Sequence, residues 1–233
     1  ELVRDGDHAR RVFTALLNSY LDPGMEHFLY GAENVCKQNN LASPLLIYRN
    51  DGNSARVAKT TAIKTWGSGP RGGLEGALAY ARLYRIPTLI TMDIGGTTTD
   101  VAVVVNNKAR LNAYGRVEAG TTSFAMPELQ SFGLGGSSII RVEDGVLKVG
   151  PESVGSVPGP VCFGRGGTDV TVTDALLLAG VIDGENYLGG ELKLDHNRAT
   201  AAIQKNIAEP MGVPLATATE RVIRSFEAEA AAA

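Results

Sequence analysis

The sequence predicts an α/β fold. Apolar residues recur at helical spacing near the N-terminus and again toward the C-terminus. Between them, two Val- and Ile-rich runs over residues 89–105 are joined by a Gly-Gly turn, as in a β-hairpin. The 233 residues are 44% hydrophobic and 20% charged, so the chain can bury the core of one large domain or two small ones.

Residues 1–66 are expected to form two helices, a first strand and a turn. These elements are predicted over 5–20, 25–39, 45–48 and 50–53. The segment Asp22-Pro23-Gly24 is typical of the end of a helix, so the two helices are expected to be separate.

A glycine-rich segment, residues 67–73, precedes a helix expected over 74–84. As a loop that enters a helix, it offers free amides and the positive end of the helix dipole to an anion. Its glycines could equally let the helix pack closely on the sheet. The sequence leaves both interpretations open, because a lone glycine-rich loop is a weak motif.

The most informative segment is residues 89–105, where an apolar strand enters Asp-Ile-Gly-Gly-Thr-Thr-Thr-Asp and leaves as a second apolar strand. Gly95 and Gly96 have no Cβ and can adopt positive φ, so their amides can approach an anion closely. The hydroxyls of Thr97, Thr98 and Thr99 add donors beside those amides. The pattern predicts a phosphate-holding hairpin.

Two carboxylates bracket these residues. Asp93 and Asp100 are hard oxygen ligands suited to Mg²⁺, which usually keeps several waters and is shared with substrate phosphates. The alternative is an ordinary tight Gly-Gly turn between buried strands. Such a turn does not need two acids around three threonines, which favours the phosphate hairpin. The sequence contains no P-loop motif, and the glycines lead into a strand, so the phosphate is expected on a hairpin turn.

Three strands are expected beyond this hairpin, over residues 110–118, 139–143 and 146–149. The last two are joined by Asp144-Gly145, a strong hairpin signal. Gly135, Gly136 and Ser137 precede them. We consider these three residues candidates for nucleotide contact through backbone amides, with a bend between strands as the alternative.

Residues 150–167 are rich in Gly and Pro and are expected to form a long ordered loop or a linker. A short helix is expected over 175–179, with Thr173 or Asp174 as its N-cap. Two C-terminal helices are expected over 198–208 and 215–226.

Composition disfavours several classes of partner. The net charge of −3 and the pI near 5.7 argue against a general nucleic-acid or anionic-membrane binder. Cys36 and Cys162 are far apart and form no C-x-x-C motif, and the three histidines lack metal-ligand spacing, so no transition-metal site is expected. Without a disulfide framework or an apolar run of membrane length, we expect a cytoplasmic protein.

An ordered series of motifs resembles the hydantoinase A / 5-oxoprolinase family and covers nearly the whole chain. The motifs are Ser68-Gly69-Pro70-x-Gly72-Gly73, Asp93-Ile94-Gly95-Gly96-Thr97-x-Thr99-Asp100-Val101, Gly135-Gly136-Ser137, Gly150-Pro151-Glu152-Ser153, Pro158-Gly159-Pro160 with Gly164-Arg165-Gly166-Gly167, and Thr171-Val172-Thr173-Asp174-Ala175. The family is similar to the actin/hexokinase/Hsp70 ATPases. The resemblance therefore implies a ribonuclease-H-like lobe over residues 67–233, with a mixed β-sheet flanked by helices. This lobe would contain the phosphate hairpin at 89–105, the Gly/Pro-rich loop at 150–167 and the C-terminal helices.

The resemblance also implies ATP and Mg²⁺ as cofactors. The residues expected to bind the nucleotide are those of the hairpin turn and the later glycine motif, namely Gly95, Gly96, Thr97, Thr98, Thr99, Gly135, Gly136 and Ser137. Asp93 is expected to hold Mg²⁺ through water, and Asp100 to support the hairpin or orient the nucleophile.

The activity implied is that of an ATP-dependent cyclic amide hydrolase of the hydantoin or 5-oxoproline type, which phosphorylates a lactam carbonyl before ring opening. One alternative is the ATPase subunit of an acetone or acetophenone carboxylase. Another is a non-catalytic assembly domain that retains the fold.

Family members carry an N-terminal domain with its own Asp-x-Gly-Gly-Thr-type motif, and no such motif precedes Asp93. We therefore expect a fragment of a larger subunit or a naturally split protein. The expected partners are the missing N-terminal lobe, a hydantoinase B-like subunit and a small cyclic amide substrate.

Overall fold

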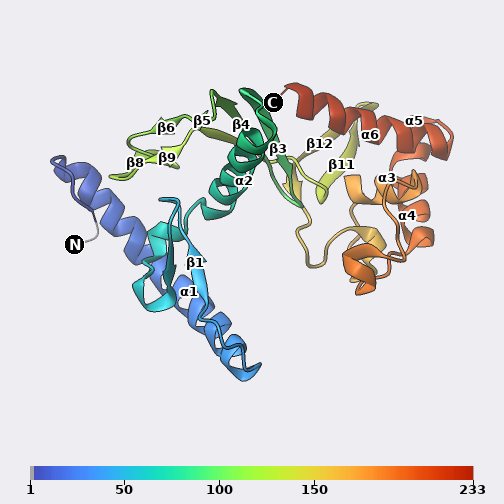
Figure 1. Cartoon of the computed structure of the whole chain (residues 1–233). Helices are drawn as coiled ribbons and strands as arrows, with labels where there is room; N and C mark the ends of the chain where they lie inside the picture. The colour runs from blue at the N-terminus through green and yellow to red at the C-terminus, as the bar shows by residue number, and fades with distance from the viewer. Residues whose placement is uncertain (1–2, 233) are drawn as a thin grey trace. The chain divides into compact units, whose positions relative to one another are not determined.

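The structure, a computed structural model, describes residues 3–232 and divides into two compact units. The first comprises Glu1–Thr91 and Val101–Gln130, and the second comprises Met92–Asp100 and Ser131–Ala233. The α-helices are α1 (His8–Gln38), α2 (Ser68–Tyr84), α3 (Val172–Leu178), α4 (His196–Ile203), α5 (Glu209–Met211) and α6 (Leu215–Ala232) (Figure 1). Short 3-10 helices span Val57–Lys59, Ala62–Thr65, Val161–Phe163 and Tyr187–Gly190, and a π-helical turn spans Gln204–Ala208.

The strands are short, except for the four strands that form two hairpins. They are β1 (Leu46–Tyr48), β2 (Ser54–Arg56), β3 (Thr88–Ile94), β4 (Thr99–Val105), β5 (Lys108–Ala109), β6 (Leu111–Asn112), β7 (Arg116–Val117), β8 (Gly120–Thr121), β9 (Met126–Pro127), β10 (Leu129–Phe132), β11 (Ser138–Glu143) and β12 (Val146–Ser153). Together with the helices they confirm the expected α/β class. The main sheet has the order β10-β4-β3, with β5 paired to β4.

Helix α1 of the first unit is longer than predicted. It runs through Pro23 without ending, so the expectation of two helices separated at Asp22-Pro23-Gly24 was wrong. Proline removes one backbone donor, and the other hydrogen bonds of this 31-residue helix carry the chain past it. The helix begins at an N-cap, Asp7, whose side chain accepts a hydrogen bond from the Arg10 amide at 3.0 Å.

Helix α2 begins earlier than predicted, at Ser68, after an N-cap glycine, Gly67, with φ of 65°. The glycine-rich segment is therefore the first turns of a helix and not a loop, which corrects our expectation. Leu74 and Leu78 of this helix are buried against Ala102 and Val104 of β4.

The prediction of one strand over 110–118 is also wrong. The chain turns at Gly115, whose amide donates to the Phe124 carbonyl at 2.8 Å. As a result, β6 pairs with β9 and β7 pairs with β8 as separate two-residue ladders.

The second unit is built on the hairpin of β11 and β12. Asp144 and Gly145 both have positive φ, at 51° and 77°, as the predicted Asp-Gly turn requires. Helix α6 lies across this hairpin (Figure 1) and contributes Val222 to a core that includes Ile140 and Ile203. Both predicted C-terminal helices are confirmed, and each extends beyond its predicted range.

Helix α3 is capped by Thr171 and not by Thr173 or Asp174 as expected. Asp174 lies at the third helical position and completes a capping box with Thr171. Its carboxylate accepts hydrogen bonds from the Thr171 amide at 2.9 Å, the Thr171 hydroxyl at 2.8 Å and the Cys162 amide at 2.8 Å. Both carboxylate oxygens of Asp174 thus accept hydrogen bonds that hold the local fold.

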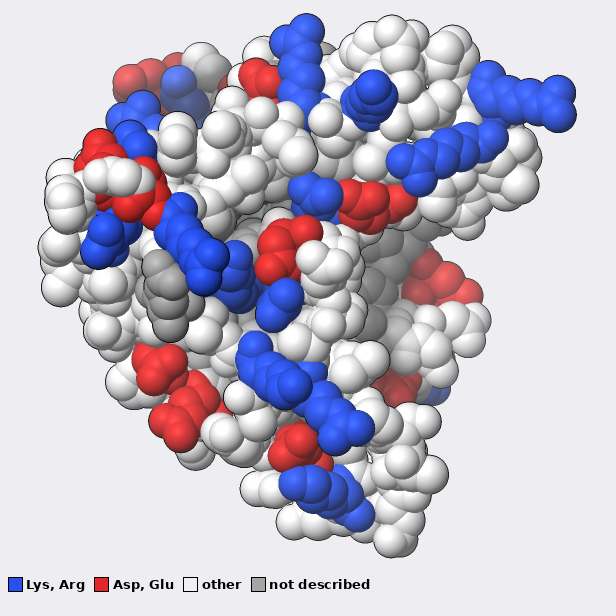
Figure 2. Space-filling model, turned by 60° about the vertical axis from the view of Figure 1, so that its left-hand side comes forward, with Lys and Arg blue, Asp and Glu red and all other residues white. Residues whose placement is uncertain are grey.

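The loop expected over 150–167 is partly strand, because β12 continues to Ser153. The division of the chain between residues 66 and 67 stays a prediction. In the part of the chain that the structure describes, no helix is both long and apolar enough to cross a bilayer. Acidic and basic side chains are interspersed over the face shown in Figure 2, as expected from a small net charge.

Candidate functional site

The hairpin of β3 and β4 closes as the sequence predicts. The Gly95 amide donates to the Thr98 carbonyl at 2.8 Å. Counting back along both strands from this pair places Asp93 opposite Asp100, and directly opposite side chains lie on the same face of a sheet. The hairpin therefore places both aspartates on the same face of the sheet, beside an exposed glycine turn.

The carbonyls of this turn are held by a second segment of the chain. The Gly136 amide donates to the Gly95 carbonyl at 3.0 Å, and the Ser137 amide donates to the Gly96 carbonyl at 2.6 Å. We call residues 135–137, which contain the two donors, the support loop.

These two bonds also orient the turn's amides. In a planar trans peptide, the C=O and N–H groups point in opposite directions. With the Gly95 and Gly96 carbonyls directed at the support loop, the Gly96 and Thr97 amides point away from it. No hydrogen bond within residues 3–232 takes up either amide, and both residues are exposed. Neighbouring amides in a turn can bind an anion, so these two amides are candidates for phosphate binding.

The close approach depends on Gly135. A Cβ at this position would lie 2.6 Å from the Gly96 carbonyl oxygen and 2.8 Å from that of Gly95. Neither Gly95 nor Gly96 adopts the positive φ that glycine allows. At Gly95 an added Cβ would instead lie 3.2 Å from the Thr98 carbonyl oxygen, so the turn uses the lack of a side chain rather than a left-handed backbone.

The three threonines divide into two kinds. Thr97 and Thr98 are exposed at the tip of the hairpin, as phosphate donors should be. Thr99 is buried, and its hydroxyl donates to the Leu134 carbonyl at 2.6 Å. Because a hydroxyl has one hydrogen to donate and a phosphate needs a donor, we correct the role of Thr99 from phosphate binding to anchoring the hairpin.

The support loop has a similar structural role. The Gly135 amide donates to the Ser138 hydroxyl at 2.8 Å, and the amides of Gly136 and Ser137 donate to the hairpin. All three amides are thus engaged within the chain. The backbone amides of Gly135, Gly136 and Ser137 are therefore not free for the nucleotide contact that was predicted through them.

The facing carboxylates suit a shared divalent cation. Asp93 is exposed, whereas the Oδ1 atom of Asp100 is buried without a hydrogen-bond partner among the described residues. Two like charges opposite each other on a sheet repel, and a buried acceptor without a donor is costly, so a cation between them would relieve both. Within residues 3–232 no three His, Cys, Asp or Glu side chains gather to hold a metal. Such a pair fits Mg²⁺ that keeps waters and shares phosphate oxygens.

Thr173 was missed by sequence reasoning, which considered it only as a helix cap. Its amide and its hydroxyl both donate to the Gly136 carbonyl, at 2.9 and 2.8 Å. No local sequence signal marks this role, because Thr173 and Gly136 are far apart in the chain and meet only in the fold.

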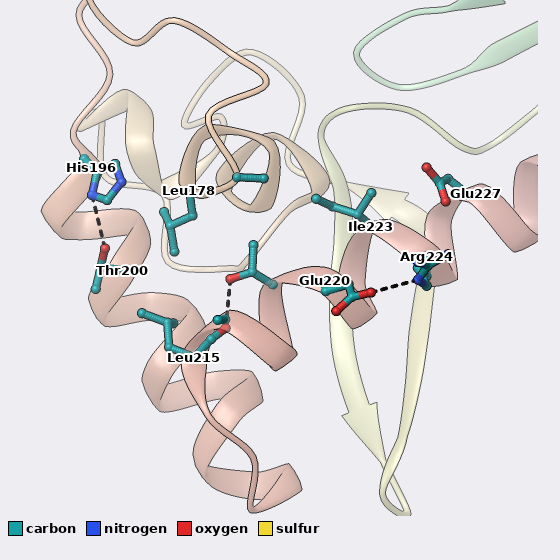
Figure 3. A pocket seen from close by; sticks show the side chains of 11 residues that line it. Leu178, His196, Thr200, Leu215, Glu220, Ile223, Arg224 and Glu227 are labelled. Carbon is teal, nitrogen blue, oxygen red and sulfur yellow. Dashed lines mark hydrogen bonds and ion pairs between the residues drawn. The ribbon is translucent and has the colours of Figure 1, made fainter.

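A groove of about 500 Å³ lies elsewhere in the second unit, among α3, α4 and α6 (Figure 3). Its wall is apolar at Leu178, Leu215 and Ile223, and Glu220 and Arg224 form an ion pair on α6 at 3.0 Å. Because its one arginine is already paired, the groove offers little to a polyphosphate. None of the predicted site residues lines it, so the hairpin is the candidate phosphate site.

The model of the hydantoinase/oxoprolinase family matches residues 11–233. The acetophenone carboxylase gamma subunit of Aromatoleum aromaticum is 36% identical over 87% of this chain and 28% of its own length. The caprolactamase subunit alpha of Pseudomonas jessenii is 32% identical over 91% of this chain and 31% of its own length.

Two solved structures share the fold. The nucleotide-free structure of acetone carboxylase superposes with a TM-score of 0.78 at 27% identity, over 86% of this chain and 29% of that one. The ATP-dependent caprolactamase from Pseudomonas jessenii superposes with a TM-score of 0.68 at 30% identity, over 91% of this chain and 31% of that one. The chain thus spans less than a third of the length of these relatives.

Proposed function

Because the chain belongs to the hydantoinase/oxoprolinase family, we propose that it supplies a phosphate-binding part of an enzyme that uses ATP to activate a cyclic amide for ring opening. The observation that carries this proposal is the pair of outward amides of Gly96 and Thr97 beside the facing carboxylates of Asp93 and Asp100. The kinship with a caprolactamase and with 5-oxoprolinase 1 of Arabidopsis thaliana, which is 32% identical over 74% of this chain and 14% of its own length, supports a cyclic amide as substrate.

The chemistry begins at the lactam carbonyl oxygen, which attacks the γ-phosphorus while the bond to the β-phosphate oxygen breaks and ADP leaves. Water then adds to the activated carbon, and the C–N bond breaks to give an amine and an acyl phosphate. A second water releases phosphate and the carboxylate. One ATP and two waters are consumed for each ring opened, and the phosphoryl step depends on positioning and charge neutralisation.

The hairpin residues fit these needs. The Gly96 and Thr97 amides and the exposed hydroxyls of Thr97 and Thr98 would cradle the β- and γ-phosphates. Gly95, whose amide donates to the Thr98 carbonyl, would shape the turn. Asp93 would hold Mg²⁺ through water, and Asp100 would support the hairpin or orient the nucleophile. Mg²⁺ itself would neutralise charge on the phosphates.

Other parts of the site belong to the rest of a longer protein in this proposal. The relatives are about three times longer than the matched region and several are subunits by name. We place a second nucleotide-binding lobe in the remainder of the subunit and expect a hydantoinase B-like partner. The cytoplasm is the compartment expected for such an enzyme.

A ketone carboxylase is the second candidate. It is favoured by the 36% identity to the acetophenone carboxylase gamma subunit and by the TM-score of 0.78 to acetone carboxylase. In that reaction the phosphorylated group would be an enol or carbonate oxygen, and the role of the hairpin would be the same.

ADP formation by the full-length protein with its partner subunit separates the candidates. Stimulation by hydantoin, 5-oxoproline or caprolactam supports the hydrolase, and stimulation by acetone or acetophenone with bicarbonate supports the carboxylase. Asp93→Asn should abolish turnover, whereas the control Asp169→Asn, at an exposed aspartate of the second unit, should not. Normal turnover by Asp93→Asn would remove Asp93 from the mechanism.

A further inference from the structure

Thr173 lies at the second position of α3, and its side chain is 6% exposed. It directs two donors at a single oxygen, the carbonyl of Gly136, from its amide at 2.9 Å and its hydroxyl at 2.8 Å. The hydroxyl is not needed to cap the helix, because Thr171 and Asp174 already form the capping box. Its bond to Gly136 therefore stabilises the support loop and not α3.

The oxygen that Thr173 holds is one end of a rigid group. The Gly136 carbonyl and the Ser137 amide belong to the same planar peptide and point in opposite directions. The Ser137 end donates to the Gly96 carbonyl at 2.6 Å. Fixing the carbonyl end thus aims the amide end at the hairpin, and hydrogen bonds linked in this way polarise one another.

The same geometry repeats once more. The Gly96 carbonyl and the Thr97 amide form the next planar peptide, whose N–H points outward from the support loop. A continuous series of hydrogen bonds and peptide planes therefore runs from the Thr173 hydroxyl to the outward amide of Thr97.

We propose that Thr173 is a positioning residue for the phosphate hairpin, acting through the Gly136–Ser137 peptide on the amides that bind phosphate. This inference rests on the function proposed above. It assigns α3 the task of setting the direction of the Thr97 amide, since the series ends at the tip of the hairpin. Thr173 itself touches no reacting atom.

Thr173→Val tests this role, because valine keeps the branched shape and removes the hydroxyl. Thr219→Val is a matched control: Thr219 is also 6% exposed, and its hydroxyl donates to the Leu215 carbonyl at 3.0 Å within α6. Thr173→Ser restores the donor. The variants are made in the full-length protein and compared by hydrogen exchange of peptides covering residues 93–100 and by ATP turnover.

We expect Thr173→Val to speed exchange of this segment about fivefold relative to the control, as expected from losing one hydrogen bond. Its kcat should fall about tenfold, because small displacements of positioning groups are costly. Thr173→Ser should restore both quantities. The melting temperatures of the two valine variants should fall by similar amounts.

Unchanged exchange of residues 93–100 in Thr173→Val, or an equal change in Thr219→Val, would overturn the inference whatever the turnover. Faster exchange in Thr173→Val, together with a wild-type protein that neither binds nor hydrolyses Mg-ATP, would instead overturn the proposed function and leave the coupling between Thr173 and the hairpin intact. The exchange readout thus separates the two failures.

Discussion

The Ser137 amide lies 2.6 Å from the Gly96 carbonyl oxygen and donates a hydrogen bond to it, although the two residues are far apart in the sequence. This bond, with its neighbour from Gly136 to Gly95, turns the carbonyls of the glycine turn toward the support loop and the Gly96 and Thr97 amides away from it. The proposed anion site therefore depends on a second segment of the chain and not on the sequence of the hairpin alone.

Gly135→Ala should disrupt this arrangement. The added Cβ would lie 2.6 Å from the Gly96 carbonyl oxygen, a backbone atom that cannot move aside without shifting the turn. We expect a loss of about 1–3 kcal/mol in the free energy of unfolding, as for other overpacked sites, together with the loss of ATP turnover. Urea unfolding and ADP formation measure the two effects.

Gly76→Ala is the control for this change. Gly76 lies within α2, and a methyl group added there would meet no atom within 4 Å outside its own stretch of helix. Alanine there should stabilise the protein by about 0.5–1 kcal/mol because glycine is costly in a helix. A Gly135→Ala protein as stable and active as Gly76→Ala would contradict the close approach of the support loop.

Thr97→Val should weaken ATP binding, whereas Thr99→Val should lower the stability of the protein. Thr99→Val leaves the buried Leu134 carbonyl without its donor and should cost about 1–3 kcal/mol of stability. Thr97→Val removes an exposed hydroxyl, so stability should change by less than about 0.5 kcal/mol. The KM for ATP should rise about fivefold in Thr97→Val if its hydroxyl contacts phosphate. A stability loss in Thr97→Val with an unaltered KM would reverse the roles assigned to the two threonines.

The local parts of this site could be predicted from sequence, and its nonlocal parts could not. The strands around Gly95-Gly96 and the turn at Asp144-Gly145 follow from periodicity and turn chemistry, which act between near neighbours. The burial of Thr99 and the engagement of the Gly136 amide depend on residues distant in the chain. Pro23 and the glycines of α2 misled the prediction because surrounding helical hydrogen bonds outweighed the local signals for a helix end and a loop.

The two cysteines should differ in reactivity. Burial, and then the nearby Asp174 carboxylate, raise the pKa of the Cys162 thiol well above its ordinary value, while Cys36 is half-buried on α1. Because the thiolate is the reactive form, iodoacetamide at pH 8 should label Cys36 before Cys162. Peptide mapping of the native protein checks the order, and earlier labelling of Cys162 would contradict its buried environment.

The same thiol should make stability depend on pH. Its folded pKa lies above the ordinary value of 9.0, so above about pH 9 the unfolded chain loses this proton while the folded chain keeps it. The contribution is therefore fully present below pH 9 and declines as the pH rises toward the folded pKa. Urea unfolding at pH 8 to 10 should show a fall in stability that is shallower in Cys162→Ala. An equal slope in both proteins would assign the fall to other groups.

The facing carboxylates predict a specific response to magnesium. Asp93→Asn removes one of two negative charges on the same face of the sheet and so relieves their repulsion. The melting temperature without metal should therefore stay constant or rise slightly. The additional rise that Mg-ADP gives the wild type should be lost in this variant and kept in Asp169→Asn. Thermal unfolding at constant ionic strength measures both, and an undiminished Mg-ADP shift in Asp93→Asn would exclude Asp93 from the metal site.

Hydrogen exchange of the full-length protein, with and without a non-hydrolysable Mg-ATP analogue, can show whether the hairpin turn binds phosphate. The outward amides of Gly96 and Thr97 should exchange rapidly in the free protein and become protected when the β- and γ-phosphates bind. Protection over residues 95–98 is the predicted result. A nucleotide that binds by calorimetry while this segment exchanges as before would contradict the assignment of the hairpin as the phosphate site.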